Sequence, residues 1–259
     1  MIHFIGAGPG DPDLITVRGA ELVATCPVVL YAGSLVPRAV VARARPGARV
    51  LDSAGMTLDE MVRVMAEAHA ADEDVARVHT GDPCLFGSTA EQMRRLDALG
   101  IRYRVVPGVS SFTAAAAALR RELTLPGVSQ AVILARAAGR TSVPEGQDLA
   151  ALAAHRATLA LFLSAGAIEE VVAALLPAYG PACPVAVVHR ASWPDERVFT
   201  GTLETIAAAV KGAAISSTAM ILVGPALGAS DFPDSRLYAP EFAHGFRSAR
   251  PLAGEEPHA

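Results

Sequence analysis

Three glycines separated by single residues, Gly6, Gly8 and Gly10, stand between a short apolar run and the first helical pattern of the chain. The run is too short for helical periodicity, so a strand, a tight loop and a helix are predicted, as at the opening of an α/β domain. Glycine has no Cβ and lets backbone groups approach a ligand closely, but it equally suits a tight turn that binds nothing. The loop therefore predicts a main-chain binding site only if its spacing and its neighbours agree.

The spacing excludes two common phosphate-binding loops. A dinucleotide fingerprint needs a third glycine where Asp11 stands, and a P-loop ends in a lysine that the segment Asp13–Thr16 lacks. The glycines do match the loop of the common methyltransferases. That fold, however, places an acid at the end of the second strand, and the segment Pro27–Ser34 holds none.

Strand and helix patterns alternate through the first half of the chain, which predicts a mostly parallel sheet with helices on both faces. The loops that follow four of its strands should share one edge of the sheet, where ligands bind. They offer glycine backbones, small hydroxyls and one carboxylate, Asp82, which also fits a turn before proline. These loops are Gly6–Thr16, Ala32–Pro37, Thr80–Ser88 and Pro107–Thr113.

The second half predicts a mixed sheet, because Arg197–Gly201 has the pattern of a strand in a hairpin. We expect an N-terminal α/β domain at 1–120, a C-terminal α/β domain at 121–230 and a loosely ordered tail at 231–259. Two capping boxes, Thr57 with Glu60 and Ser88 with Glu91, predict the starts of two helices in the first domain.

Composition narrows the class of protein. The net charge of −4 argues against a nucleic-acid partner, which usually needs a basic face. No apolar run reaches the length of a membrane span, and no signal peptide is recognisable. Cys26, Cys84 and Cys183 lie far apart and form no CxxC pair, which favours reduced thiols in a cytoplasmic protein.

Three motifs in order carry a resemblance to a known family: the segments Gly6–Thr16, Gly81–Gly87 and Val106–Ser111. Together they resemble the tetrapyrrole methylase family over about residues 1 to 230. The family uses S-adenosylmethionine but differs in fold from the common methyltransferases. Within it, the segments Tyr31–Val36 and Ala191–Glu196 resemble the branch that methylates precorrin-4 at C11, giving precorrin-5 in cobalamin synthesis.

The resemblance implies two α/β domains with the methyl donor between them, a homodimer, and S-adenosylhomocysteine as product. Residues of both domains would contact the donor, although Leu163 and Ala219 also fit ordinary strand core. A sulfonium ligand without phosphates needs close backbone approach and apolar walls around its adenine. The implied donor-binding residues are Pro9, Thr80, Gly81, Asp82, Leu85, Ser110, Ser111, Leu163, Ala191, Thr218 and Ala219.

The implied acceptor is a reduced tetrapyrrole with many acetate and propionate groups, which arginine side chains bind well. Arg38, Arg140 and Arg190 follow strands or motif loops and are the predicted substrate-binding residues. Asp52 and Tyr31 are candidate catalytic residues, and Asp82 is a further candidate base. His79 and His189 fit hydrogen-bonded histidines at strand ends, and no metal-ligand spacing is present, so no metal is predicted.

Several alternatives remain open. The acceptor could carry cobalt, or the enzyme could methylate another tetrapyrrole carbon or a modified histidine on a protein. A non-catalytic module that binds a tetrapyrrole or a nucleotide belongs to a different class. A nicotinamide-dependent oxidoreductase requires the glycine loop to tolerate a pyrophosphate, which the carboxylates of Asp11 and Asp13 would repel.

Overall fold

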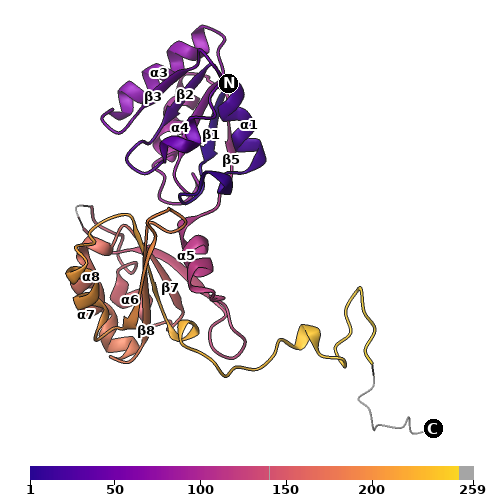
Figure 1. The fold of residues 1–259 in the computed structure, drawn as a ribbon, viewed down its shortest axis with the longest axis vertical. Coiled ribbons are helices and arrows are strands. Elements are labelled where there is room, and N and C mark those ends of the chain that lie inside the picture. Colours follow the sequence, from indigo (N-terminus) through magenta and orange to yellow (C-terminus); the bar gives the residue numbers. More distant parts are fainter. Residues whose placement is uncertain (140, 251–259) are drawn as a thin grey trace.

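Short apolar segments in the first half of the chain form one sheet of five parallel strands in the order β3-β2-β4-β1-β5 (Figure 1). The structure, a computed structural model, describes residues 1–139 and 141–250. The central strands β1 and β4 are buried along their whole length, as expected for a parallel sheet covered on both faces. The strands are β1 (Ile2–Gly6), β2 (Val28–Tyr31), β3 (Arg49–Asp52), β4 (Val75–His79) and β5 (Tyr103–Val106).

Helices cover both faces of this first sheet. Successive residues of a strand point to opposite faces, so apolar side chains on each face pack against a different set of helices. Ile5 and Val29 pack beneath α1 and α2, whereas Phe4 and Leu30 pack beneath α3 and α4. Each face therefore has its own apolar core. The helices are α1 (Val17–Thr25), α2 (Arg38–Val41), α3 (Leu58–Ala70) and α4 (Ala90–Ala98), with a 3-10 turn η1 (Pro12–Leu14) in the glycine loop.

The second sheet is mixed, in the order β6-β7-β10-β8-β9. Strand β6 runs parallel to β7, whereas β10 is antiparallel to β7 and β8, and β8 forms the predicted hairpin with β9. The prediction of a parallel sheet followed by a mixed one is confirmed. The strands are β6 (Val132–Arg136), β7 (Thr158–Phe162), β8 (Pro184–His189), β9 (Arg197–Thr202) and β10 (Ala219–Val223).

The helix α5 (Ser111–Leu119) packs by its alanines on one face of the second sheet, against Ala160, Ala186 and Met220. Its residues precede 120, the expected end of the first domain, yet its partners belong to the second sheet, as Figure 1 shows. The opposite face is covered by α6 (Leu149–Ala153), α7 (Ile168–Tyr179) and α8 (Ile206–Gly212). Three further 3-10 turns are η2 (Ala165–Ala167), η3 (Pro225–Leu227) and η4 (Arg236–Tyr238).

Of the two predicted capping boxes, one is confirmed and one is wrong. Thr57 and Glu60 exchange both hydrogen bonds at the start of α3. Ser88 does not cap α4: its φ is +48° and the N-cap is Thr89, whose hydroxyl donates instead to the carbonyl of Pro83 at 2.9 Å. The sharp turn after Gly87 thus places the helix start one residue later than the motif indicates.

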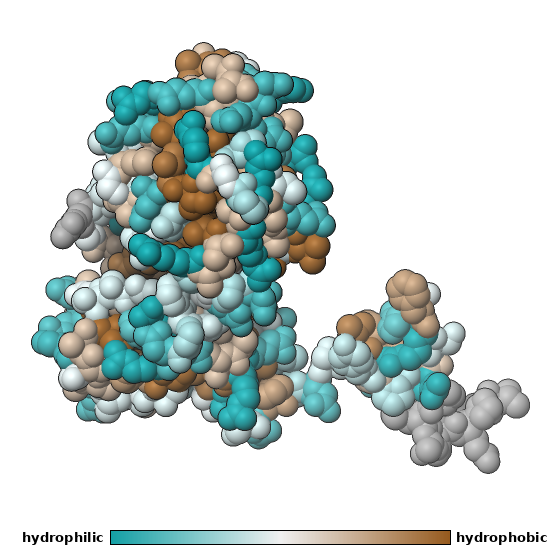
Figure 2. Space-filling model, turned by 45° about the horizontal axis from the view of Figure 1, so that its top comes forward, coloured by the Kyte–Doolittle hydropathy of each residue, from teal (hydrophilic) through white to brown (hydrophobic). Residues whose placement is uncertain are grey.

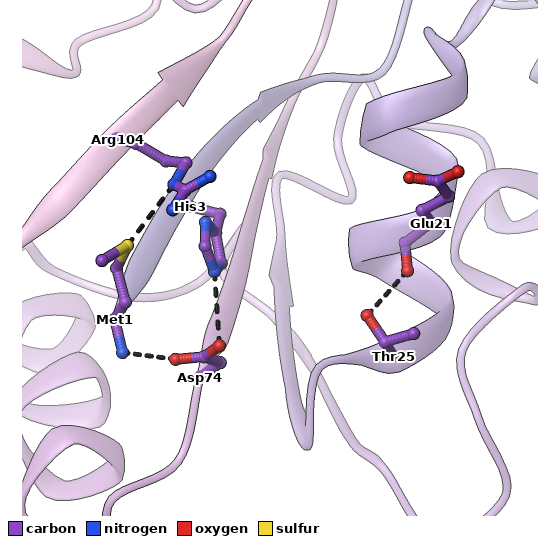
Figure 3. A network of polar contacts seen from close by, with 6 residues as sticks. All are labelled: Met1, His3, Glu21, Thr25, Asp74 and Arg104. Atoms are coloured by element: carbon purple, nitrogen blue, oxygen red, sulfur yellow. Dashed lines mark hydrogen bonds and ion pairs between the residues drawn. The ribbon is translucent and has the colours of Figure 1, made fainter.

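A separate polar cluster lies at the amino ends of the strands of the first sheet (Figure 3). The N-terminal amine of Met1 binds the carboxylate of Asp74, and Nε2 of His3 lies 3.5 Å from the same carboxylate. Burial lowers the pKa of His3, while the bond to the N-terminus is the main cause that lowers the pKa of Asp74. These groups join the start of β1 to the start of β4, away from the strand ends that form the predicted site.

Beyond η3 the chain leaves the second domain as an arm, residues 231–250, whose side chains are almost all exposed (Figure 1). Arg247 organises its end by donating to the carbonyls of Leu237 and Ala239 at 2.8 and 2.7 Å. On the face drawn in Figure 2 both domains present a mixture of hydrophilic and hydrophobic residues, and the arm stands apart from them. Among the described residues, no helix combines the length and hydrophobicity needed to cross a membrane.

Candidate functional site

The carboxyl ends of the first sheet face the second domain, and a cavity of about 490 Å³ lies between them. All four loops predicted to share this edge reach it, with Pro9 after β1, Ser34 after β2, Asp82 after β4 and Ser110 after β5. The second domain closes the cavity with the segments that follow β7 and β8 and the one that precedes β10. A volume of this size lies within the range of about 300–1,000 Å³ that is usual for small-molecule sites.

The eleven residues named above as donor-binding all line this one cavity, although they come from seven separate places in the sequence. Arg190, one of the predicted substrate-binding residues, lines it too. Leu163 is not strand core: β7 ends at Phe162, and Leu163 has a φ of +54° and is 73% exposed. The structure thus brings these residues together at one cavity. That they bind the donor, or in the case of Arg190 the substrate, stays a prediction.

Glycine backbones form the floor of the cavity on the first-domain side. Gly6, Gly81 and Gly108, from three different strand ends, pack against one another without side chains. A Cβ on Gly108 would lie 2.2 Å from the carbonyl oxygen of Gly81 and 2.7 Å from the Cα of Gly6. Gly8 and Gly81 also exchange backbone hydrogen bonds of 3.3 and 2.8 Å. The loops can meet at this distance because Gly6 and Gly108 lack a Cβ, whereas at Gly81 it is the φ of +60° that favours glycine.

Asp82 fixes two of these loops to each other. Its Oδ1 accepts from the N–H of Cys84 at 2.7 Å, which is the predicted turn, and its Oδ2 accepts from the N–H of Gly108 at 2.9 Å. The second bond spans 26 residues and joins the end of β4 to the end of β5. Asp82 therefore organises the cavity floor as well as lining it.

The second domain supplies a wall of apolar and hydroxyl groups. Phe162 stacks on Phe86 of the first domain with ring centroids 4.8 Å apart, so aromatic rings bridge the two domains at the cavity. Ser110, the N-cap of α5, is buried and makes no capping hydrogen bond with its side chain. Its hydroxyl thus remains available to a polar group of a ligand.

Ser192 and Trp193 of the second domain, which we call the clasp, form hydrogen bonds to the glycine loop. The indole N–H of Trp193 donates to the carbonyl of Pro9 at 3.0 Å, and the hydroxyl of Ser192 accepts from the N–H of Asp11 at 3.0 Å. A Cβ on Gly10 would lie only 2.1 Å from the Trp193 ring. Arg190 lies over that ring, 4.2 Å from its centroid, and pairs with Asp195 at 2.7 Å.

We expect Trp193→Phe to keep the ring on Gly10 but lose the hydrogen bond to Pro9. One net hydrogen bond contributes about 0.5–1.5 kcal/mol, so stability should fall by that amount and affinity for the cavity's ligand should weaken a few-fold. Trp193→Ala should lose more, because it also removes the packing on Gly10. Urea unfolding and calorimetry check both variants; equal effects of the two would contradict a role for the N–H.

Of the remaining candidates, those that the structure describes do not line the cavity. Tyr31 is buried in the core beneath α1 and α2. Asp52 is exposed and uses Oδ1 to accept from the N–H groups of Gly33 and Ala54. Arg38 is exposed at the start of α2, and Arg140 lies outside the described residues. A catalytic role for Asp52 or Tyr31, and substrate binding by Arg38 or Arg140, stay predictions.

The two strand-end histidines are neutral at pH 7. Burial, followed by the charge of Arg77, lowers the pKa of His79 to about 3. Burial is also the main cause that lowers the pKa of His189. Within the described part of the chain, no three acidic, histidine or cysteine side chains gather as a metal site would require.

Sequence reasoning missed part of the lining. Ser216 and Ser217 extend the Thr218–Ala219 segment toward the cavity, and a run of hydroxyls just before a strand was the available signal. The other missed residues are mostly apolar, and their types do not distinguish a cavity wall from core. These missed residues are Ser34, Leu35, Phe86, Phe162, Ala165, Val188 and Met220.

The fold and the site define a two-domain α/β protein that holds a small molecule between glycine backbones and a largely apolar wall. A family model described as Tetrapyrrole (Corrin/Porphyrin) Methylases matches residues 1–207. The chain belongs to the tetrapyrrole methylase family.

Three relatives show how far the similarity extends. A precorrin-4 C(11)-methyltransferase of Pseudomonas aeruginosa is 52% identical over 246 residues, which cover 95% of this chain and 98% of the relative. The crystal structure of a cobalt precorrin-4 methyltransferase has 48% identity and a TM-score of 0.85, covering 87% of this chain and 95% of its own. A uroporphyrin-III C-methyltransferase from Thermus thermophilus, solved with S-adenosylhomocysteine, has 30% identity, a TM-score of 0.73 and coverages of 87% and 92%.

Proposed function

We propose that this protein transfers a methyl group from S-adenosylmethionine to C11 of precorrin-4, producing precorrin-5 and S-adenosylhomocysteine in cobalamin synthesis. The observation that carries the proposal is the 52% identity to a precorrin-4 C(11)-methyltransferase over nearly its whole length. The cavity supports it further, because the eleven residues that the family resemblance implies as donor-binding line one space of suitable volume.

The residues of the cavity suit a donor without phosphates. The Gly81 and Asp82 segment and the Ser110 and Ser111 hydroxyls offer polar contacts to its amino-acid and ribose parts. The apolar wall from Leu163, Ala191 and Ala219 suits an adenine ring. The relative solved with S-adenosylhomocysteine shows that this fold accommodates such a molecule in that protein.

When bound, the donor supplies a methyl group on a positively charged sulfur, which is already a good leaving group. The protein's contribution is positioning, since well-oriented reactants recover roughly 7–11 kcal/mol of a bimolecular barrier. The glycine floor fixes one side of the cavity and the clasp around Trp193 fixes the domains against each other. The Phe86 and Phe162 pair adds apolar surface to the cavity where the two domains meet, which reduces contact with water while charge is neutralised.

Incubation of the purified chain with methyl-labelled donor and metal-free precorrin-4 tests the proposal. We expect one label per product molecule, located at C11 by mass spectrometry and NMR. Label at another carbon would assign a different tetrapyrrole methylase activity. No transfer to any tetrapyrrole, with the donor bound, would indicate a binding module and overturn the proposal.

Cobalt-precorrin-4 is a second candidate acceptor, supported by the 48% identity and TM-score of 0.85 to a cobalt precorrin-4 methyltransferase. Parallel assays with metal-free and cobalt-loaded acceptors, compared by kcat/KM, decide between the two. A higher value for the cobalt-loaded form would place this chain on the route in which cobalt is inserted early.

We also propose a homodimer acting in the cytoplasm. The family resemblance supports the dimer, and the cysteines, which are all unpaired, suit a reducing compartment. Light scattering on the purified chain gives the mass of the particle; a monomer at micromolar concentration would contradict the dimer.

A further inference from the structure

The central strand β4 carries an arginine in its middle. All five residues of β4 are buried, and Arg77 is only 3% exposed. Burial lowers the pKa of its guanidinium to about 10, so the group still carries its charge at neutral pH. Among the described residues, no acidic side chain forms an ion pair with it. Buried charges are normally paired, so this one lacks its expected partner.

The hydrogen bonds of Arg77 show where the partner is missing. Nε donates to Oε1 of Gln92 at 3.0 Å, and Nη1 donates to the hydroxyl of Ser53 at 3.0 Å and to the carbonyl of Leu30 at 3.4 Å. Nη2 donates to the sulfur of Met61 at 3.2 Å. A thioether is a weak acceptor, so the two N–H groups of Nη2 lack a strong one.

A second cavity, of about 280 Å³, adjoins this guanidinium. Arg77, Ser53, Met61 and Gln92 all line it, and Ser34 lines both this cavity and the first one. The other ionisable groups on its wall are the neutral ring of His79 and the carboxylate of Glu91. Ser34, in the loop after β2, therefore borders both cavities, and Arg77 with its weak acceptor Met61 lies at the second.

We propose that Arg77 binds one carboxylate of the tetrapyrrole acceptor, which enters the second cavity beside the donor. The inference rests on the proposed function, because methyl transfer requires an acceptor next to the donor cavity. An acetate or propionate arm supplies the two oxygens that a guanidinium edge matches, and the Ser53 hydroxyl stands beside it. The donor also carries a carboxylate, so the test must separate the two sources.

The first test compares Arg77→Met with Arg104→Met, an exposed arginine on the neighbouring part of the sheet. The probe is uroporphyrin III, a fluorescent tetrapyrrole with eight carboxylates, whose Kd does not depend on turnover. We expect Arg77→Met to weaken its binding by about tenfold or more, and Arg104→Met to leave it unchanged. The Kd for S-adenosylhomocysteine should stay within about twofold in both variants if the carboxylate belongs to the acceptor.

A second pair of variants serves if Arg77→Met does not fold. Met61→Glu places a carboxylate next to Nη2, which should occupy the guanidinium and weaken uroporphyrin binding while the protein stays folded. Met61→Leu is the matched control and should bind as the wild type does. A purely structural role for Arg77 predicts no change in tetrapyrrole affinity for Met61→Glu.

Unchanged uroporphyrin affinity in folded Arg77→Met or Met61→Glu would overturn the inference, and so would loss of donor affinity in parallel. Arg77→Lys, which keeps the charge, should recover part of the affinity. Failure of the proposed function would look different, since the wild type would bind both probes but transfer no label to precorrin-4.

Discussion

Asp82→Ala is expected to weaken donor binding more than any other single side-chain truncation in the cavity. The variant removes both acceptors that join the loops after β4 and β5, leaving the N–H groups of Cys84 and Gly108 without them. Leaving the part-buried N–H of Gly108 without its acceptor costs about 1–3 kcal/mol, which corresponds to roughly a 5-fold to 150-fold loss of affinity. The loss arises because the floor of the cavity must be reordered before the donor can bind.

Titration calorimetry with S-adenosylhomocysteine measures this effect directly. Asp82→Asn should fall between the wild type and Asp82→Ala, since its amide oxygen can still accept one of the two bonds. Asp59→Ala is the matched control: its carboxylate pairs with Arg95 at 3.1 Å on the surface of α3 and lines neither cavity. Wild-type affinity in Asp82→Ala would refute the role assigned to this residue.

The sequence was informative wherever a local pattern and a topological rule act together. A parallel first sheet and a mixed second sheet could be predicted, because strand and helix patterns alternate in the first half and Arg197–Gly201 has a hairpin pattern in the second. Loops after parallel strands must share one edge, so the meeting of Pro9, Asp82 and Ser110 followed without knowledge of their contacts. The donor residues of the second domain came from the family resemblance instead.

Other features depend on contacts that no local pattern contains. Asp52 and Tyr31 stand at neighbouring strand ends, a usual position for catalytic residues in a parallel sheet. The carboxylate of Asp52, however, accepts hydrogen bonds from backbone N–H groups, and the side chain of Tyr31 faces the core. The Trp193 clasp joins residues 184 positions apart. Arg77 was not singled out, because an arginine within a short strand gives no sign of whether its charge is paired.

Gly108→Ala is expected to destabilise the protein strongly, because the added methyl has no room. Its Cβ would lie 2.2 Å from the Gly81 carbonyl and 2.7 Å from the Cα of Gly6, and both neighbours are backbone atoms at strand ends. They cannot rotate away as a side chain would, so the loops themselves must separate. Overpacking of this kind costs about 1–3 kcal/mol or more. Separation also lengthens the bond from the Gly108 N–H to Asp82, so donor affinity should fall with stability.

Gly55→Ala is the control that isolates this steric cause. Nothing lies within 4 Å of a Cβ at Gly55, and its φ is not in the left-handed region, so the extra methyl should change stability little. Thermal unfolding of the two variants should differ by several degrees, since about 1 kcal/mol shifts Tm by roughly 2–4 °C in a chain of this size. Equal melting temperatures would show that the three strand ends are not held in backbone contact.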